Sequence, residues 1–177
     1  MGKTIIVANR HDGMTAAIMK KMPDAIVSPN FDVEIDQGDT LCWLPLPGDP
    51  VDEEVQELAT LIDHSVFLPT KIIMLSLPGT ADDTSEDELV NWYGKKVIGW
   101  LMAHQYAIKM IDEFEIPYTI IRTPLIINHE TTVEIVDEGK PLSSREIGLP
   151  QLVTLITEVI KSQRYQNRSI GIAKKGS

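Results

Sequence analysis

Residues 107–124 read AIKMIDEFEIPYTIIRTP, and this stretch, with the helix that enters it from about Val97, decides the fold. Along that helix, the residues of one face recur every three or four positions, which is typical of a helix packed on a core. They are Val97, Leu101, His104, Ile108 and Ile111. After a turn at Ile116-Pro117, Tyr118 to Ile121 forms a β-prone run typical of a strand covered on both faces. A helix that runs directly into a buried strand is half of a parallel βαβ unit, so the rest of the chain should supply further parallel strands.

Short apolar runs alternate with amphipathic segments along the rest of the chain. The predicted strands are 4–8, 25–27, 41–46, 71–77, 133–136 and 169–173, and the further predicted helices are 14–22, 51–62 and 150–161. Residues 28–40 are polar, and Asp32 to Ile35 is the one candidate for an additional strand in this region. Because there is no internal repeat or low-complexity linker, the pattern predicts a single α/β domain over residues 1–177. Its mostly parallel sheet should be doubly wound, with helices on both faces.

Composition narrows the classes of function. The chain has 177 residues, a net charge of −10 and 43% hydrophobic residues. This charge argues against sequence-independent binding of nucleic acid, which needs clustered Lys and Arg. No apolar run reaches the length of a membrane span and the first residues do not form a signal peptide, so we expect a soluble cytoplasmic protein. No HxxxH or CxxC spacing is present, so we expect no metal site.

In an open parallel sheet, ligands bind beyond the carboxyl ends of the strands, near the point where the strand order reverses. The residues at this edge can be listed from the predicted strands alone. They are residues 9–14, 28–30, 45–48, 76–80 and 123–126. We therefore expect the functional site among these five segments.

Several of these segments resemble one known family. IPYTIIRTPLI at residues 116–126 is similar to a motif of the atypical short-chain dehydrogenases/reductases, the NmrA-like, NAD(P)H-binding group. IIMLSLPG at 72–79 resembles that family's strand ending in serine, and PLSSREIGLPQLVTLI at 141–156 with RSIGIA at 168–173 resembles its late helix and last strand. The resemblance spans nearly the whole chain and implies a Rossmann-like fold that binds NAD or NADP. Family members are usually longer, which implies a shortening between Ser28 and Leu41.

The resemblance also implies which residues would contact the dinucleotide. They are Asn9, Arg10, His11, Asp12, Gly13, Met14, Ser28, Pro45, Ser76 and Pro124. The family's glycine motif after the first strand is replaced here, because Asn9, Asp12 and Thr15 occupy the glycine positions. A carboxylate at Asp12 would repel a diphosphate by about 4 kcal/mol at ~4 Å and an effective dielectric of ~20. Arg10 could hold a phosphate instead, or Asn9 and Asp12 could act only as turn and cap residues.

The catalytic Tyr and Lys of the family, four residues apart on the long helix, fall on Trp100 and His104. An indole N–H is no acid near neutral pH, whereas His104 could transfer a proton or could be a structural residue hydrogen-bonded in the core. Ser76 keeps the family's serine position, so Ser76 and His104 are the catalytic candidates. Tyr93 and Lys96 are three residues apart rather than four, and Tyr93 lies too early in the chain to match the pattern.

Two hypotheses of different classes follow. The first is an NmrA-like oxidoreductase that binds NAD(P) weakly or in an altered way, and that would pair as a homodimer through the long helix as its relatives do. The second is a non-catalytic sensor or protein-interaction module that has lost dinucleotide binding, because the glycines and both helix residues have been replaced.

Overall fold

The structure, a computed structural model, describes residues 2–176. Seven strands form one sheet in the order β2-β1-β3-β4-β5-β9-β7, in which only β7 runs antiparallel to its neighbour. These strands are β2 (Ile26–Ser28), β1 (Thr4–Val7), β3 (Thr40–Trp43), β4 (Lys71–Ser76), β5 (Tyr118–Arg122), β9 (Arg168–Ala173) and β7 (Glu134–Val136). Beside it, β6 (Leu125–Ile127) and β8 (Glu146–Gly148) form a small parallel pair. The predicted doubly wound, mostly parallel sheet is confirmed.

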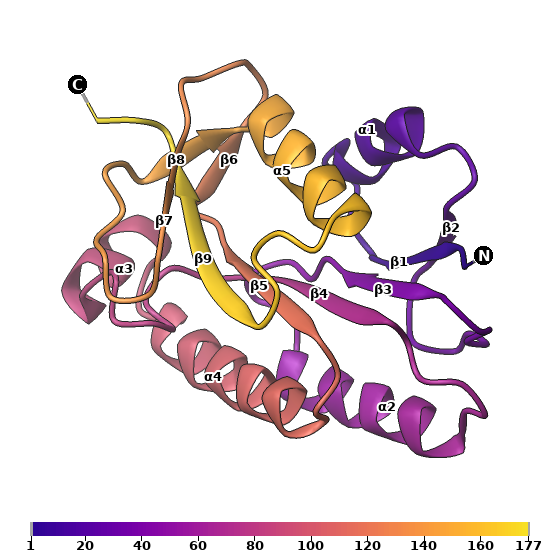
Figure 1. The fold of residues 1–177 in the computed structure, drawn as a ribbon. Coiled ribbons are helices and arrows are strands. Elements are labelled where there is room, and N and C mark those ends of the chain that lie inside the picture. Colours follow the sequence, from indigo (N-terminus) through magenta and orange to yellow (C-terminus); the bar gives the residue numbers. More distant parts are fainter. Residues whose placement is uncertain (1, 177) are drawn as a thin grey trace.

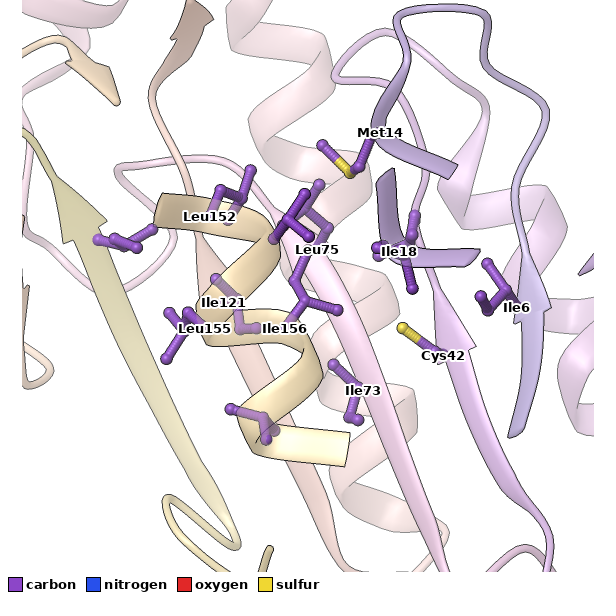
Figure 2. Close-up of a cluster of buried hydrophobic side chains, with 14 of the residues drawn as sticks. Ile6, Met14, Ile18, Cys42, Ile73, Leu75, Ile121, Leu152, Leu155 and Ile156 are labelled. Carbon is purple, nitrogen blue, oxygen red and sulfur yellow. The ribbon is translucent and has the colours of Figure 1, made fainter. Parts of the chain in front are cut away.

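Helices cover both faces of this sheet, as Figure 1 shows. On one face lie α1 (Met14–Lys21) and α5 (Leu149–Lys161), and on the other lie α2 (Val51–His64) and α4 (Val97–Glu113). Alternate residues of the strands supply the two cores. Ile6, Cys42 and Ile73 face α1 and α5, where Met14 and Leu152 meet them (Figure 2), whereas their chain neighbours point to α2 and α4. Two covered faces explain why the strands consist of nearly continuous apolar runs.

The strand that Asp32 to Ile35 could have formed does not exist, so that prediction is wrong. Residues 29–39 cross from β2 past β1 to β3 without joining the sheet, and β2 is therefore its edge strand. Phe31 and Ile35 are buried in the core beneath this crossing, and the Phe31 ring packs edge-on against Trp43 at 5.2 Å. Side-chain burial, not strand pairing, holds this segment in place.

The long helix begins at Val97 as predicted, but the residues before it form a separate helix, α3 (Glu86–Tyr93). Gly94, with φ of 91°, ends α3 in a conformation that residues with a Cβ rarely adopt. Trp92 and Tyr93 are consequently half-buried against the start of α4 and are not exposed on its surface. Within residues 2–176, no helix has both the length and the apolar character needed to cross a bilayer.

A buried ion pair ties the loop after β4 to the centre of the sheet. Arg122 Nη1 lies 2.5 Å from Asp83 Oδ2, and both side chains are fully buried. Arg122 also donates to the hydroxyl and the carbonyl of Ser169 on β9, while Asp83 accepts from the Gly79 N–H. The arginine of the IPYTIIRTP stretch is therefore a structural group that joins β5, β9 and the loop 79–85.

Candidate functional site

A cavity of about 210 Å³ opens at the carboxyl edge of the sheet. Its lining comes from the segments that follow β1, β3 and β5, from the end of β4, from β6 and from two helices. The lining residues are Arg10, Asp12, Pro45, Leu46, Pro47, Leu75, Ser76, Tyr93, His104, Thr123, Pro124, Leu125 and Ile126. Because β1 leads to β2 on one side while β3 flanks it on the other, this cavity lies at the topological switch point, where open α/β sheets bind ligands.

At the floor of the cavity, Ser76 and His104 form a hydrogen-bonded pair. Ser76 Oγ lies 2.8 Å from His104 Nδ1, and His104 Nε2 lies 3.1 Å from the carbonyl oxygen of Pro47. A carbonyl can only accept, so Nε2 must carry the ring proton and Nδ1 must accept the hydrogen bond that the Ser76 hydroxyl donates. The long-range contact therefore fixes both the tautomer of His104 and the direction in which Ser76 donates.

His104 is neutral at physiological pH. Its side chain is only 1% exposed, and burial lowers its pKa to about 4, although the hydrogen bond to Pro47 acts in the opposite direction. A neutral imidazole can accept a proton from Ser76, but it has none to donate through Nδ1. His104 thus can hold Ser76 in one orientation and can act as a base toward it, whereas it is a poor acid near pH 7.

The loop after β1 is closed by its own ion pair. Arg10 directs two N–H groups at the Asp12 carboxylate, with its Nη2 at 2.7 Å, and donates through Nη1 to the carbonyls of Leu44 and Pro45 at 3.2 Å. Asp12 in turn accepts from the Met14 N–H at the start of α1, at 3.3 Å. Partial burial alone would raise the pKa of Asp12, but the hydrogen bonds and charge of Arg10 outweigh it and hold this pKa below its usual range. The anion at the N-terminus of α1 is therefore a side chain of the protein itself.

The sequence did not point to Tyr93, which nevertheless lines the cavity beside Ser76 and His104. Its ring packs edge-on against Trp100, with ring centroids 6.3 Å apart, and Trp100 rests on Gly48, where a Cβ would lie 3.0 Å from the indole. Trp100, which the resemblance placed at the family's tyrosine position, does not line the cavity but packs against a tyrosine of the preceding helix. Spacing along one helix could not reveal this, because Tyr93 belongs to another helix.

The structure brings together some of the predicted site residues and separates others. Arg10, Asp12, Pro45, Ser76, His104 and Pro124 line the cavity, whereas Asn9, His11, Gly13 and Ser28 do not. The Met14 side chain is buried in the core between α1 and α5, so only its main chain faces the loop. That these residues contact a dinucleotide stays a prediction.

No protein-family model and no curated protein matches the amino-acid sequence. Solved structures do match its fold. A short-chain dehydrogenase/reductase from Veillonella parvula superimposes with a TM-score of 0.75 at 13% identity, over 99% of this chain and 96% of that one. Our chain has the fold of the short-chain dehydrogenases/reductases. The structure of the Veillonella parvula protein in complex with NADP matches at a TM-score of 0.68 and 15% identity, over 99% and 95% of the two chains. An anaerobillin reductase from Escherichia coli O157:H7 matches at a TM-score of 0.70 and 11% identity, over 98% of this chain and 97% of that one.

One solved structure with this fold holds NADP, so the residues of this chain can be compared with what a dinucleotide needs. The cavity end fits a small, mostly apolar ring, since aliphatic side chains and prolines dominate its lining and the Ser76 hydroxyl oxygen can still accept a hydrogen bond. The loop between β1 and α1 does not fit a diphosphate, because the Asp12 carboxylate already accepts from the Met14 N–H and pairs with Arg10. A dinucleotide would have to displace this carboxylate before its phosphates could reach the helix N-terminus.

Proposed function

We propose that this protein is an NmrA-like atypical short-chain dehydrogenase/reductase that binds NAD(P) weakly and acts as an oxidoreductase on a small substrate. One observation carries the proposal: the cavity with Ser76 at its floor lies at the switch point of a fold shared with such enzymes over nearly the whole chain. Weak binding follows from the Arg10–Asp12 ion pair, which must open to admit a diphosphate. The cavity residues themselves would orient the substrate, with Ser76 held by neutral His104.

Thermal melts and calorimetric titrations with NAD, NADH, NADP and NADPH test this function. A ligand present at 100 times its dissociation constant adds about 2.7 kcal/mol to the free energy of unfolding, which a melt registers readily. We expect an upward shift with at least one nucleotide at millimolar concentration, and none with adenine alone. Absence of any shift with all four nucleotides would contradict the proposal.

Removing the charge of Asp12 should strengthen dinucleotide binding. Asp12→Asn keeps the shape of the side chain but ends its repulsion of a phosphate, which is about 4 kcal/mol at ~4 Å and an effective dielectric of ~20. It also releases Arg10 to pair with the ligand. Because a carboxamide still occupies the loop, we expect only part of this energy, so that calorimetry should give an NADPH dissociation constant about tenfold lower, or ~1.4 kcal/mol.

Asp24→Asn is the matched control for this experiment. It makes the same change in net charge at an exposed turn far from the cavity lining. The dissociation constant of this control should stay within about twofold of the wild type, since exposed charges more than ~8 Å away are screened at physiological salt. Equal NADPH affinity in wild type, Asp12→Asn and Asp24→Asn would show that the Asp12 carboxylate does not oppose the diphosphate.

The second candidate function is a non-catalytic sensor or protein-interaction module. The Arg10–Asp12 ion pair favours this alternative, because the Asp12 carboxylate already occupies the position at the N-terminus of α1 that a phosphate would take. Under this alternative, neither the wild type nor Asp12→Asn responds to any of the four nucleotides, although both keep a cooperative melt. Capture of a defined protein partner at the cavity edge, lost on substitution of cavity residues, would then favour the module.

We also propose that two copies pair through α4. Met102 and Tyr106 of this helix are 67% and 43% exposed, which is uncommon for side chains of this size. Light scattering behind a sizing column would give the mass in solution. A monomer at all concentrations would contradict the pairing without affecting the enzyme proposal.

A further inference from the structure

The Ser76 hydroxyl has one hydrogen, and the contacts of His104 decide where this hydrogen points. His104 Nε2 lies 3.1 Å from the carbonyl oxygen of Pro47, which can only accept, so Nε2 carries the ring proton. Nδ1 of the same ring is then an acceptor, and Ser76 Oγ donates its hydrogen to it at 2.8 Å. Toward the cavity that it lines, Ser76 therefore presents only the lone pairs of Oγ and acts as an acceptor.

The main chain of the cavity lining offers few hydrogen-bond donors. Three of the lining residues are prolines, which have no N–H group. Three further N–H groups of the lining already donate within the protein at 2.9–3.0 Å, and they belong to Leu46, Thr123 and Leu125. A ligand that needs a main-chain donor therefore finds little to bind in this cavity.

The side-chain donors of the lining are engaged as well. Arg10 donates to Asp12 and to two main-chain carbonyls, and its side chain is only 2% exposed. The Thr123 hydroxyl is directed at the carbonyl oxygen of Pro124 at 3.4 Å. The Tyr93 hydroxyl has almost no accessible surface, so its O–H is not offered to a ligand. The polar side-chain groups that stay open to a ligand are thus acceptors, namely Ser76 Oγ and the partly exposed carboxylate of Asp12.

A carbonyl ligand can accept from Ser76 only if the hydroxyl turns away from His104. Nδ1 of the buried imidazole would then lose its donor, and an unpaired buried acceptor costs at least as much free energy as one ordinary hydrogen bond contributes. A ligand with its own O–H instead donates to Ser76 Oγ and leaves the pair intact. We propose that the Ser76–His104 pair makes this cavity selective for small, uncharged ligands that bear a hydroxyl group, and against carbonyl compounds of the same size.

The rest of the lining describes the body of this ligand. Four lining side chains are aliphatic, and they are Leu46, Leu75, Leu125 and Ile126. The volume of about 210 Å³ is below the ~300 Å³ at which drug-sized ligands begin to fit, so the ligand is small and mostly apolar. The inference rests on the proposed function in taking this cavity as the substrate site. It deepens that function, because it assigns the alcohol, and not the carbonyl compound, as the form that the site binds more tightly.

Two ring compounds of nearly equal size test the proposal without any nucleotide. Cyclohexanol donates through its hydroxyl, whereas cyclohexanone can only accept. Their dissociation constants are measured by ligand-observed NMR on the wild type, on His104→Phe and on the control His129→Phe, whose histidine is exposed and lies outside the lining. We expect the wild type and the control to prefer cyclohexanol about tenfold, within the range set by one unpaired buried acceptor. In His104→Phe the Ser76 hydroxyl is free to donate to a ligand, so the ratio should fall to about one.

A measurement on the wild type alone covers the case in which His104→Phe does not fold. Nitrogen NMR of the histidine rings at pH 7 reports which ring nitrogen carries the proton, and for His104 we expect Nε2. A proton on Nδ1, or equal or tighter binding of cyclohexanone by the wild type, would overturn the inference. A cyclohexanol preference that persists in His104→Phe, or failure of the wild type to bind either probe at millimolar concentration, would overturn it too. A negative nucleotide melt contradicts only the proposed function, since the probes need no dinucleotide.

Discussion

Asp83→Asn is expected to destabilise the folded protein by about 3–5 kcal/mol, because it leaves the guanidinium of Arg122 charged, buried and without its counter-ion. The free energy of unfolding of a domain is about 5–15 kcal/mol, so this single change could remove much of it. Urea denaturation followed by circular dichroism measures the loss. The carbonyl oxygen of the asparagine can still accept from the Gly79 N–H, so the change acts mainly on the ion pair with Arg122.

An exposed ion pair supplies the matched control. Arg164 and Glu158 pair at 2.6 Å with 60% and 39% of their side chains exposed, and Glu158→Gln should leave the free energy of unfolding almost unchanged. The double variant Asp83→Leu/Arg122→Met removes both buried charges, so it should be more stable than Asp83→Asn. If Asp83→Asn unfolded within about 1 kcal/mol of the wild type, Arg122 would not depend on this carboxylate.

The second large effect is a loss of stability below pH 6.5 that comes from His104. In the unfolded chain, His104 takes up a proton near pH 6.5, whereas the buried side chain does so only at about pH 4. Between these values the unfolded state binds more protons, so stability falls as the pH falls, and above pH 6.5 the contribution is constant. The shift corresponds to about 3 kcal/mol of unfolding free energy.

The measurement compares wild type and His104→Gln by urea denaturation between pH 4 and pH 7. Glu54 acts in the opposite direction, because burial raises its pKa to about 7 and its contribution to stability is lost as the pH rises from about 4.5. Since Glu54 is present in both proteins, its effect cancels in the difference. The advantage of the wild type over His104→Gln should shrink by about 3 kcal/mol on acidification. An advantage independent of pH would mean that folding does not shift the pKa of His104.

The sheet could be predicted because its strands carry the signature of burial on both faces. Lys71 to Ser76 and Tyr118 to Arg122 are β-prone apolar runs that pair in parallel, with Ile72 opposite Tyr118. The segment Asp32 to Ile35 misled the prediction, since its two apolar residues serve the core without entering the sheet. The local sequence pattern predicts that a side chain will be buried, but it does not predict whether the main chain of that residue pairs with a neighbouring strand.

For the candidate site too, the sequence predicted some contacts and left others undecided. That Ser76, Asp12 and Pro124 would meet at one edge followed from the carboxyl ends of parallel strands. The sequence did not predict that Arg10 pairs with Asp12, because Arg10 could equally have been free to bind a phosphate. Tyr93 was set aside on spacing, although packing of α3 against α4 places it in the cavity.

The sequence by itself determined the layers of this protein and the shared edge of its strands. It also showed that Asn9, Asp12 and Thr15 stand where the family that it resembles has glycines, and Trp100 and His104 where that family has its Tyr and Lys. These properties depend on periodicity and on the identity of single residues, which local physics dictates. Only the tertiary structure decided the partners: Asp83 for Arg122, Pro47 for His104 and Asp12 for Arg10. Hydrogen bonds and ion pairs form between residues brought together by the packing of whole elements, so their pairing is absent from any one segment of the chain.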